Sequence, residues 1–158
     1  MEQRWLTIEN IGNDVVLTKC AKEAFGEIVI PVGVTIIGDH AFEGSFSGMR
    51  SVFDSSPIVF ASVKLPEGIT RIGSNAFYMC KRLISINIPK SVVSIGDNAF
   101  AFCSSLTSIV IPEGVISIGK GAFHNCSNLL SITIPDGVTN IGSLAFAGCK
   151  KLNNNLKK

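Results

Sequence analysis

Apolar and polar residues repeat along this chain with a period of 23 residues. In one representative unit, Ile86 and Ile88 alternate with polar neighbours, which predicts a short strand with one buried face. Pro89 has no main-chain N–H and is expected to end that strand. Val92 and Ile95 then predict a second, shorter extended segment. Each unit therefore contributes two short strands.

The remainder of the unit is predicted to be a compact turn. Gly96 interrupts the extended segment, and Asp97 has a side chain suited to a helix N-cap. We expect a single helical turn that carries Phe100 inward and closes at Cys103. Leu106 then begins the next unit.

Proline, glycine, alanine–phenylalanine and cysteine residues recur in register in four consecutive units. The positions are Pro66, Pro89, Pro112 and Pro135; Gly73, Gly96, Gly119 and Gly142; Ala76-Phe77, Ala99-Phe100, Ala122-Phe123 and Ala145-Phe146; Cys80, Cys103, Cys126 and Cys149. One coil cannot bury its apolar edge alone, whereas stacked coils allow each Ile, Phe and Cys to pack on its equivalent. The spacing predicts an α/β repeat, a solenoid of 23-residue coils with mostly short parallel strands and single helical turns.

A first, irregular coil begins at Phe25. Its proline lies 35 residues before the next one, which is 12 more than the regular step, and the extra residues fall at about 44–56. Insertions in repeats map to loops, and such loops often carry function. Phe46, Met49 and Phe53 make this segment a candidate binding loop. The alternative is a tolerated surface insertion that packs its phenylalanines against the edge of a coil.

Both ends of the array resemble caps. Residues 1–24 contain two runs with strand character around a turn at Gly12, which predicts an N-terminal capping hairpin. Residues 25–158 then form the solenoid, and Asn155 and Lys157 stand in columns that hold isoleucine elsewhere. Polar residues there would blunt an exposed sheet edge. A longer array that is cut at this point would explain them equally well.

The segment 88–106, with its Pro, Ile-Gly, Ala-Phe, Cys and Leu positions, resembles the BspA-type leucine-rich repeat, also seen in the Treponema pallidum leucine-rich-repeat proteins. The resemblance covers about residues 25–152. It implies a right-handed leucine-rich-repeat solenoid, often found in surface proteins of host-associated bacteria and of some parasitic protists, that acts in adhesion and protein binding. None of the shared columns is catalytic. The chain departs from the family in having Ser45 in the cysteine column and no apolar signal-peptide core at its start. A bacterial cell-surface or secreted location is thus implied by the resemblance alone.

Composition narrows the classes of function. The chain of 158 residues is 46% apolar and 16% charged, which suits one domain with a full core. The net charge is +2, and four of the 14 basic residues lie in the last nine positions. We therefore expect no clustered basic face of the kind that binds nucleic acid. No apolar run reaches the roughly 20 residues that a membrane span requires.

The five cysteines are predicted to belong to the core. None forms a closely spaced pair of the kind that binds zinc. Equivalent residues on stacked coils lie ~4.8 Å apart with parallel side chains, whereas a disulfide needs converging Cβ atoms about 3.5–4.5 Å apart. His124 lies near Cys126 in the sequence, which raises the alternative of a thiol enzyme. Because Cys126 stands in a core column, we expect a non-enzymatic protein without cofactor or metal.

The outward positions of the predicted strands indicate where the protein binds. They hold small residues, few charges and several apolar side chains, and they lack aromatic residues that stack on sugars or bases. The candidate binding residues are Ile84, Asn87, Val110, Leu130 and Thr133. We expect a protein partner, such as a host or extracellular-matrix protein, or a second copy of the chain. The alternative is a structural spacer, a repeat fragment of a larger protein with no ligand of its own.

Overall fold

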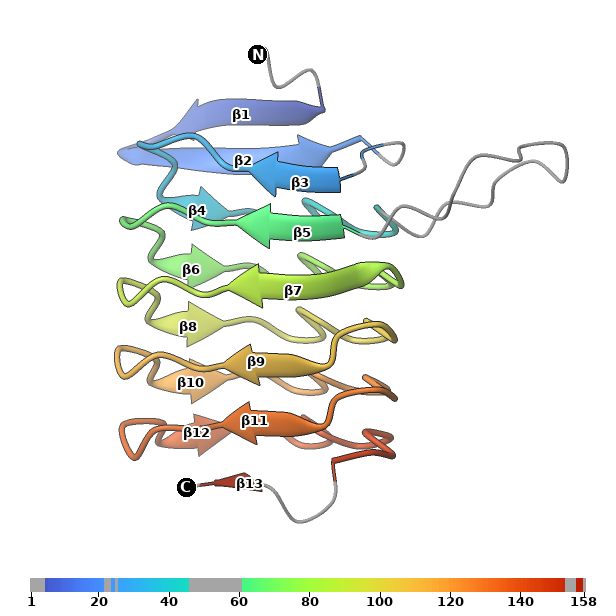
Figure 1. The fold of residues 1–158 in the computed structure, drawn as a ribbon. Helices are drawn as coiled ribbons and strands as arrows, with labels where there is room; N and C mark the ends of the chain where they lie inside the picture. Colours follow the sequence, from blue (N-terminus) through green and yellow to red (C-terminus); the bar gives the residue numbers. More distant parts are fainter. Residues whose placement is uncertain (1–4, 22–23, 25, 46–60, 153–155, 158) are drawn as a thin grey trace, which may run out of the picture.

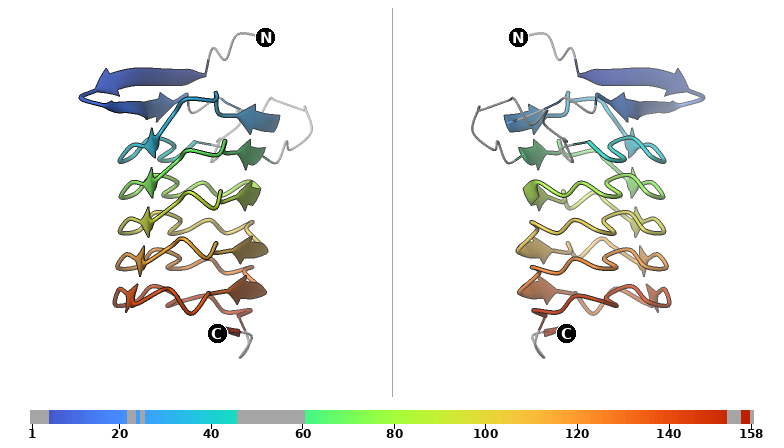
Figure 2. Two further views of the ribbon diagram at one scale, coloured as in Figure 1. Left: turned by 90° about the vertical axis from the view of Figure 1, so that its left-hand side faces the viewer. Right: turned by 90° about the vertical axis from the view of Figure 1, so that its right-hand side faces the viewer.

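The computed structural model describes residues 5–21, 24, 26–45, 61–152 and 156–157. Over these residues the chain winds into a right-handed solenoid of stacked coils (Figure 1). Each complete coil has a strand on either side of the core and a turn between them. The views from the two sides show the same stacking along the whole length of the solenoid (Figure 2).

One side, which we call the strand face, holds one strand of every coil. Its strands are β3 (Gly26–Val29), β5 (Ala61–Lys64), β7 (Leu83–Asn87), β9 (Ser108–Val110), β11 (Ser131–Thr133) and β13 (Leu156–Lys157). They form two parallel sheets of three strands, β3-β5-β7 and β9-β11-β13. The register places Ile28 beside Val63 and Val63 beside Ile86, so each coil stacks an apolar side chain on that of the next.

The opposite side is one seven-stranded sheet in the order β1-β2-β4-β6-β8-β10-β12. Its strands are β1 (Leu6–Ile11), β2 (Asp14–Cys20), β4 (Ile36–Ile37), β6 (Arg71–Ile72), β8 (Ser94–Ile95), β10 (Ser117–Ile118) and β12 (Asn140–Ile141). β1 and β2 form an antiparallel hairpin at the N-terminal end, and the later strands pair in parallel. The assignment of residues 1–24 to a separate cap stays a prediction.

The core contains a continuous stack of phenylalanine rings. Successive ring centroids lie 4.6 Å apart for Phe42–Phe77, 5.1 Å for Phe77–Phe100, 5.3 Å for Phe100–Phe123 and 5.6 Å for Phe123–Phe146. The rings are nearly parallel, and all but the last are fully buried. The predicted stack is confirmed, and Phe42 of the irregular first coil extends it by one ring.

The third side of the coil, the turn side, comprises residues 38–45, 73–82, 96–105, 119–128 and 142–151. Alternate N–H groups there donate to the next coil: Asn98 to Lys120 O (2.8 Å), Phe100 to Ala122 O (2.7 Å) and Phe102 to His124 O (2.8 Å). Left-handed conformations at Asn98 (φ 52°) and Phe102 (φ 62°) prevent this segment from forming a helix. The expected single helical turn is therefore a run of tight turns. The described part of the chain contains no helix, and so none that could cross a membrane.

Asp97 caps a neighbouring coil rather than a helix of its own. Its carboxylate accepts the main-chain N–H of Lys120 in the following coil at 2.7 Å. Asp39 accepts the N–H of Ser74 in the same way at 2.9 Å. The carboxylate of Asp97 thus accepts a main-chain N–H, as an N-cap residue does, but the N–H belongs to the next coil and not to a helix of its own coil.

The last strand pairs one residue out of the expected register. β13 lies beside β11 with Leu156 opposite Ile132 and Lys157 opposite Thr133. The prediction that Asn155 takes the isoleucine position is therefore wrong, and Asn155 itself lies outside the described residues. The shift brings an apolar residue to the position that Asn155 was expected to fill.

Candidate protein-binding face

The outward side chains of the strand face form three columns, at the positions of Ile84, Ser85 and Asn87 and their equivalents. Ser85 and Asn87 alternate with the buried Ile86, whereas Ile84 lies directly before Ser85 and is exposed as well. Ser62, Ser85, Ser108 and Ser131 make the middle column. Residues at the start of the strands make the second, with Ile84, Thr107 and Leu130. Residues at the end of the strands make the third, with Asn87, Val110 and Thr133. The inward residues between these columns, such as Ile86 and Ile109, are buried.

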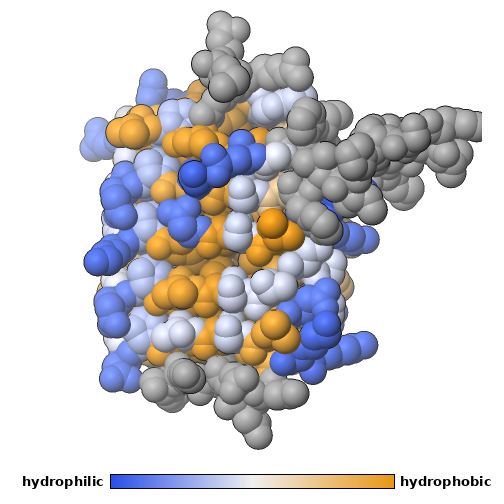
Figure 3. All heavy atoms as spheres, in the orientation of Figure 1, coloured by the Kyte–Doolittle hydropathy of each residue, from blue (hydrophilic) through white to orange (hydrophobic). Residues whose placement is uncertain are grey.

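The exposed apolar residues of this face lie on both sides of the serine column. Ile84, Val110 and Leu130 have exposed fractions of 41%, 66% and 52%. Ile84 and Leu130 share the column at the start of the strands, whereas Val110 lies in the column at their end. Figure 3 shows hydrophobic areas on either side of a paler band. The exposed apolar residues therefore form two strips, one on either side of the serine column.

Asn87, one of the predicted binding residues, also has a structural role. Its side-chain carbonyl accepts the N–H of Leu65 at 3.2 Å, and its side-chain NH₂ donates to the carbonyl of Leu65 at 3.2 Å. This amide satisfies both main-chain groups of Leu65 where β5 has ended. Thr133 lies exposed beside Val110 in the register of β9 and β11.

Charge is distributed unevenly over the surface. β7, β9 and β11 carry no charged residue, and the pair Glu27–Lys64 (2.8 Å) joins β3 to β5. The turn side, by contrast, gathers the basic residues Lys81, Arg82, Lys120, Lys150 and Lys151. These residues come from coils distant in sequence, and the same side also carries Asp39, Glu43 and Asp97. The expectation that the chain has no basic face of the kind that binds nucleic acid stays a prediction.

The residues of the candidate binding loop, Phe46, Met49 and Phe53, lie outside the described residues. Ser45, just before them, is fully buried, and its hydroxyl donates to the carbonyl of Cys20 at 3.3 Å. Ser45 thus occupies the cysteine position of the first coil as a hydrogen-bonded core residue.

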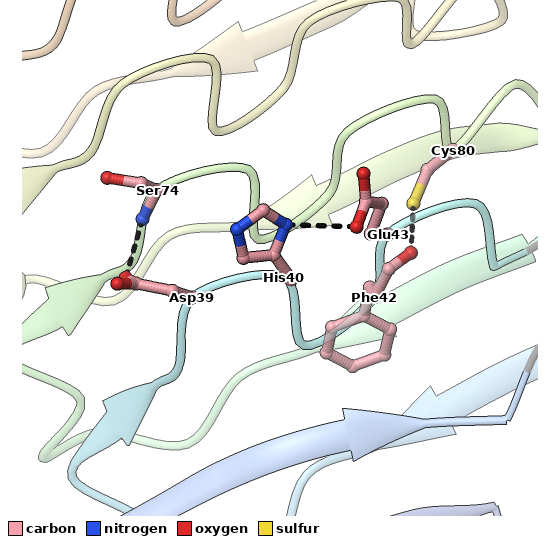
Figure 4. Close-up of polar contacts among 6 residues, drawn as sticks. All are labelled: Asp39, His40, Phe42, Glu43, Ser74 and Cys80. Atoms are coloured by element: carbon pink, nitrogen blue, oxygen red, sulfur yellow. Dashed lines mark hydrogen bonds and ion pairs between the residues drawn. The ribbon is translucent and has the colours of Figure 1, made fainter.

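A partly open hollow of about 700 Å³ lies at the N-terminal end of the turn side, and the sequence gave no indication of it. Residues from three coils or strands line it, among them Lys19, His40, Glu43, Met79 and Lys81. His40 Nδ1 lies 2.9 Å from Glu43 Oε2 (Figure 4). Residues so far apart in the chain carry no shared sequence signal, because only the coil stacking brings them together.

The thiols of the core do not pair with imidazoles. Cys80 donates to the carbonyl of Phe42 at 3.0 Å, and in Figure 4 its sulfur points toward that carbonyl and not toward His40. Cys126 donates to the carbonyl of Phe100 at 3.1 Å, while His124 Nε2 lies 3.0 Å from the amide nitrogen of Asn125. No Cys–His arrangement suited to nucleophilic catalysis is therefore formed at either histidine.

All five cysteines are free, as expected for core residues. Burial raises the pKa of the Cys80 and Cys103 thiols above the ordinary value, and it raises that of Cys20 to about 12. Cys149, at the last coil, is only half-buried. Within the described ranges, no group of three or more His, Cys, Asp or Glu residues is placed to hold a metal ion.

Comparison with known proteins agrees with this architecture. The family described as BspA type leucine-rich repeat region matches residues 13–153 in six copies. No curated protein matches the chain. Among solved structures, the leucine-rich repeat protein of Treponema pallidum is similar with a TM-score of 0.82 and 26% identity, over 96% of this chain and 68% of that one.

Two further solved structures are similar over nearly the whole chain. A leucine-rich repeat protein of Bacteroides ovatus has a TM-score of 0.78 and 31% identity, covering 97% of this chain and 40% of that one. A leucine-rich cell surface protein of Faecalibacterium prausnitzii has a TM-score of 0.57 and 26% identity, covering 97% of this chain and 53% of that one. The chain thus spans only part of the length of each of these proteins.

Proposed function

The chain belongs to the BspA-type leucine-rich repeat family, and from this premise we propose that it is a non-enzymatic scaffold that binds a protein partner through its strand face. The observation that carries the proposal is the exposure of Ile84 and Val110 on strands that bear no charge, and of Leu130 directly before another such strand. Large apolar side chains on an otherwise small and polar sheet surface favour a contact with another protein.

The geometry of the strand face suits such a contact. Parallel strands at a regular spacing present an extended surface, which repeat proteins commonly use for binding. The serine column between the apolar strips offers hydroxyl groups that donate and accept hydrogen bonds. A partner that covers the strips can therefore also pair with the polar groups between them, as protein interfaces generally do.

We further propose that the protein is a surface or adhesion module of a bacterium. The support is the resemblance to a protein described as a cell surface protein in Faecalibacterium prausnitzii. The partner proposed on this basis is a host or extracellular-matrix protein.

The test is binding of the chain to a panel of extracellular-matrix proteins by surface plasmon resonance. The variant Ile84→Lys/Val110→Lys/Leu130→Lys places three charges on the strand face without touching a buried residue, so it should fold normally and lose binding. The matched control is Val32→Lys/Val93→Lys/Ile116→Lys, which makes the same charge change at exposed apolar residues off this face. The control should bind as the wild type does.

Equal binding by both triple variants would place the contact away from the strand face. Absence of binding to every panel member, together with no capture from host-cell extract, would favour the spacer role instead. Circular dichroism and the melting temperature of each variant separate loss of contact from loss of fold.

A further inference from the structure

The turn side carries a concentration of positive charge. In its four regular coils, residues 73–82, 96–105, 119–128 and 142–151, it holds five basic residues, Lys81, Arg82, Lys120, Lys150 and Lys151, and one acidic residue, Asp97, a net charge of +4. Its first coil, residues 38–45, adds Asp39, which pairs with Arg71 at 2.8 Å, and Glu43, which lies 2.9 Å from His40, so the formal net charge of the whole turn side is +2. The four lysines are exposed, whereas the Asp97 carboxylate already accepts a main-chain N–H. The four regular coils of the turn side thus present a positively charged surface.

Apolar and aromatic residues lie on the same side of the coils. Tyr78 and Phe102 meet edge to face with ring centroids 5.6 Å apart, and Phe102 and His124 do so at 5.5 Å. Met79 and Leu144 have exposed fractions of 37% and 60%. These side chains come from four successive coils and are outside the phenylalanine stack of the core.

Three of these residues are in backbone conformations that large side chains rarely adopt. The φ angles are 58° at Met79, 62° at Phe102 and 61° at Leu144. Met79 and Phe102 share one column, whose other members are Gly44, Asn125 and Gly148. Leu144 stands in a second column, whose other members include Asn75, Asn98 and Gly121. Glycine and asparagine tolerate the left-handed region far better. Bulky apolar residues at such positions reduce stability, which points to a use for them.

We propose that the turn side is a second docking surface, and that its occupant is an acidic segment of a partner protein with apolar side chains. Positive charge attracts the acidic groups of such a segment and steers its approach. Met79, Phe102 and Leu144 supply the apolar contacts. This surface is separate from the strand face and extends beyond the function proposed above.

The hollow at the N-terminal end of the turn side fits this occupant. Met79 and Lys81 belong both to the hollow and to the turn side, and Lys19 and His40 add basic groups to its wall. An apolar side chain of the partner can enter beside Met79 while a neighbouring carboxylate meets Lys81 or Lys19. Glu43 is already engaged with His40.

A polyphosphate or polysulfate chain fits the same surface less well. It would neutralise the lysines but would leave Met79, Phe102 and Leu144 without apolar partners. The rings of Tyr78 and Phe102 stand edge to face and half-buried, so they offer no flat platform on which bases stack. The described surface favours an acidic polypeptide.

The probe for the test is a fluorescein-labelled peptide of alternating glutamate and leucine, followed by fluorescence anisotropy. A peptide of alternating glutamate and serine has the same charge without apolar groups, and heparin serves as the polyanion. The glutamate–leucine peptide should bind the intact chain most tightly, and its affinity should fall as salt is added.

Two double variants separate charge from apolar contact. Lys81→Gln/Lys150→Gln should weaken peptide binding about tenfold, the change that roughly 1.4 kcal/mol produces, whereas Lys64→Gln/Lys90→Gln should leave it unchanged. Met79→Asn/Leu144→Asn introduces the residue found at the equivalent positions 125 and 98. It should weaken binding by a similar factor and raise the melting temperature, because the backbone strain is relieved.

Each contrary result would overturn the proposal. Tighter binding of heparin, or equal binding of the two glutamate peptides, would identify a polyanion site. Equal losses in the two lysine variants would show nonspecific attraction. Unchanged binding by the asparagine variant would remove the apolar contact from the site. The variant Ile84→Lys/Val110→Lys/Leu130→Lys should still bind the peptide, which would show that the turn side binds independently of the strand face.

Discussion

The thiol of Cys103 donates a hydrogen bond to the main-chain carbonyl of Phe77 in the preceding coil, with a sulfur–oxygen distance of 3.2 Å. The same carbonyl also accepts the N–H of Cys80 from its own coil at 3.2 Å. The thiol of Cys103 therefore donates to the second lone pair of the carbonyl oxygen. Cys126 and Cys149 repeat the contact at 3.1 Å each. The cysteine column therefore ties successive coils together through thiol–carbonyl hydrogen bonds.

This arrangement predicts the order in which the cysteines react. Cys149 is half-buried, whereas Cys80, Cys103 and Cys126 are fully buried, and reaction requires an exposed thiolate. Iodoacetamide should therefore modify Cys149 first in the folded chain and the three others only after denaturation. Peptide mass spectrometry of samples quenched over time measures this order. Early labelling of Cys103, or a mass two units low per bridge without reductant, would contradict the ladder of free thiols.

The raised thiol pKa values predict a loss of stability at alkaline pH. Burial raises the pKa of Cys80 and Cys103 above the ordinary 9.0, so the unfolded chain releases these protons at lower pH than the folded chain does. Their contribution to the free energy of unfolding is then constant below about pH 9 and falls as the pH rises further. Urea denaturation on both sides of this pH measures the slope. Cys80→Ala/Cys103→Ala should show a shallower slope, and equal slopes would refute the assignment.

The phenylalanine stack predicts a graded cost of truncation. Phe100 is fully buried between two parallel rings, whereas Phe146 is half-buried and has one stacked neighbour. Phe100→Ala should lower the free energy of unfolding by about 3–5 kcal/mol, the usual loss for a buried aromatic residue. Phe146→Ala should cost clearly less. Chemical denaturation of the two variants and the wild type measures these free energies of unfolding. Equal decreases in the two variants would mean that the last coil is as well packed as the middle of the solenoid.

The glycine column predicts a steric effect. A Cβ atom added at Gly96 would lie 2.6 Å from the main-chain nitrogen of Ser74 in the preceding coil, closer than van der Waals contact allows. Gly96→Ala should therefore push two coils apart and destabilise the chain by about 1–3 kcal/mol, as overpacking does. At Gly137 the nearest atom is 3.2 Å away, so Gly137→Ala is the milder control. A neutral effect at Gly96 would show that the coils separate freely.

Much of the fold could be predicted from the sequence because each core contact joins equivalent residues of adjacent units. The stacking of Phe77 on Phe100 follows directly from their spacing. The glycine column was read only as a strand breaker, because its reason, the approach of Ser74 to Gly96, requires the stacked coils. The sequence predicted a helical turn where the structure has tight turns. The tight turns are stabilised because the N–H groups of Asn98 and Phe102 donate to carbonyls of a different coil. Helix propensity takes no account of such partners.

The candidate sites show the same division. The exposure of Val110 follows from strand periodicity, which places it on the face opposite the buried Ile109 and Ile111. Ile84 and Leu130 lie two residues before the buried Ile86 and Ile132, so their exposure departs from that alternation. The structural role of Asn87 could not be predicted from the sequence, because its partner Leu65 lies in another coil and the contact depends on side-chain orientation. The basic residues of the turn side also required the structure, since they stand in three different columns, Lys81 with Lys150, Arg82 with Lys151, and Lys120 apart from both pairs.

The final prediction concerns the extra residues of the first coil. Ser45 is buried in the cysteine column and Ala61 begins the next strand, so the intervening segment joins two regular positions of adjacent coils. Deletion of residues 46–57 restores the regular spacing and should leave the melting temperature nearly unchanged, because loop length contributes little to closure entropy. The deletion variant is compared with the wild type by calorimetry. The control is a deletion of equal length taken from residues 96–107, which removes Phe100 and should unfold the chain. If deletion of 46–57 is equally damaging, then the segment contributes to the core, and Phe46, Met49 and Phe53 are structural residues rather than a binding loop.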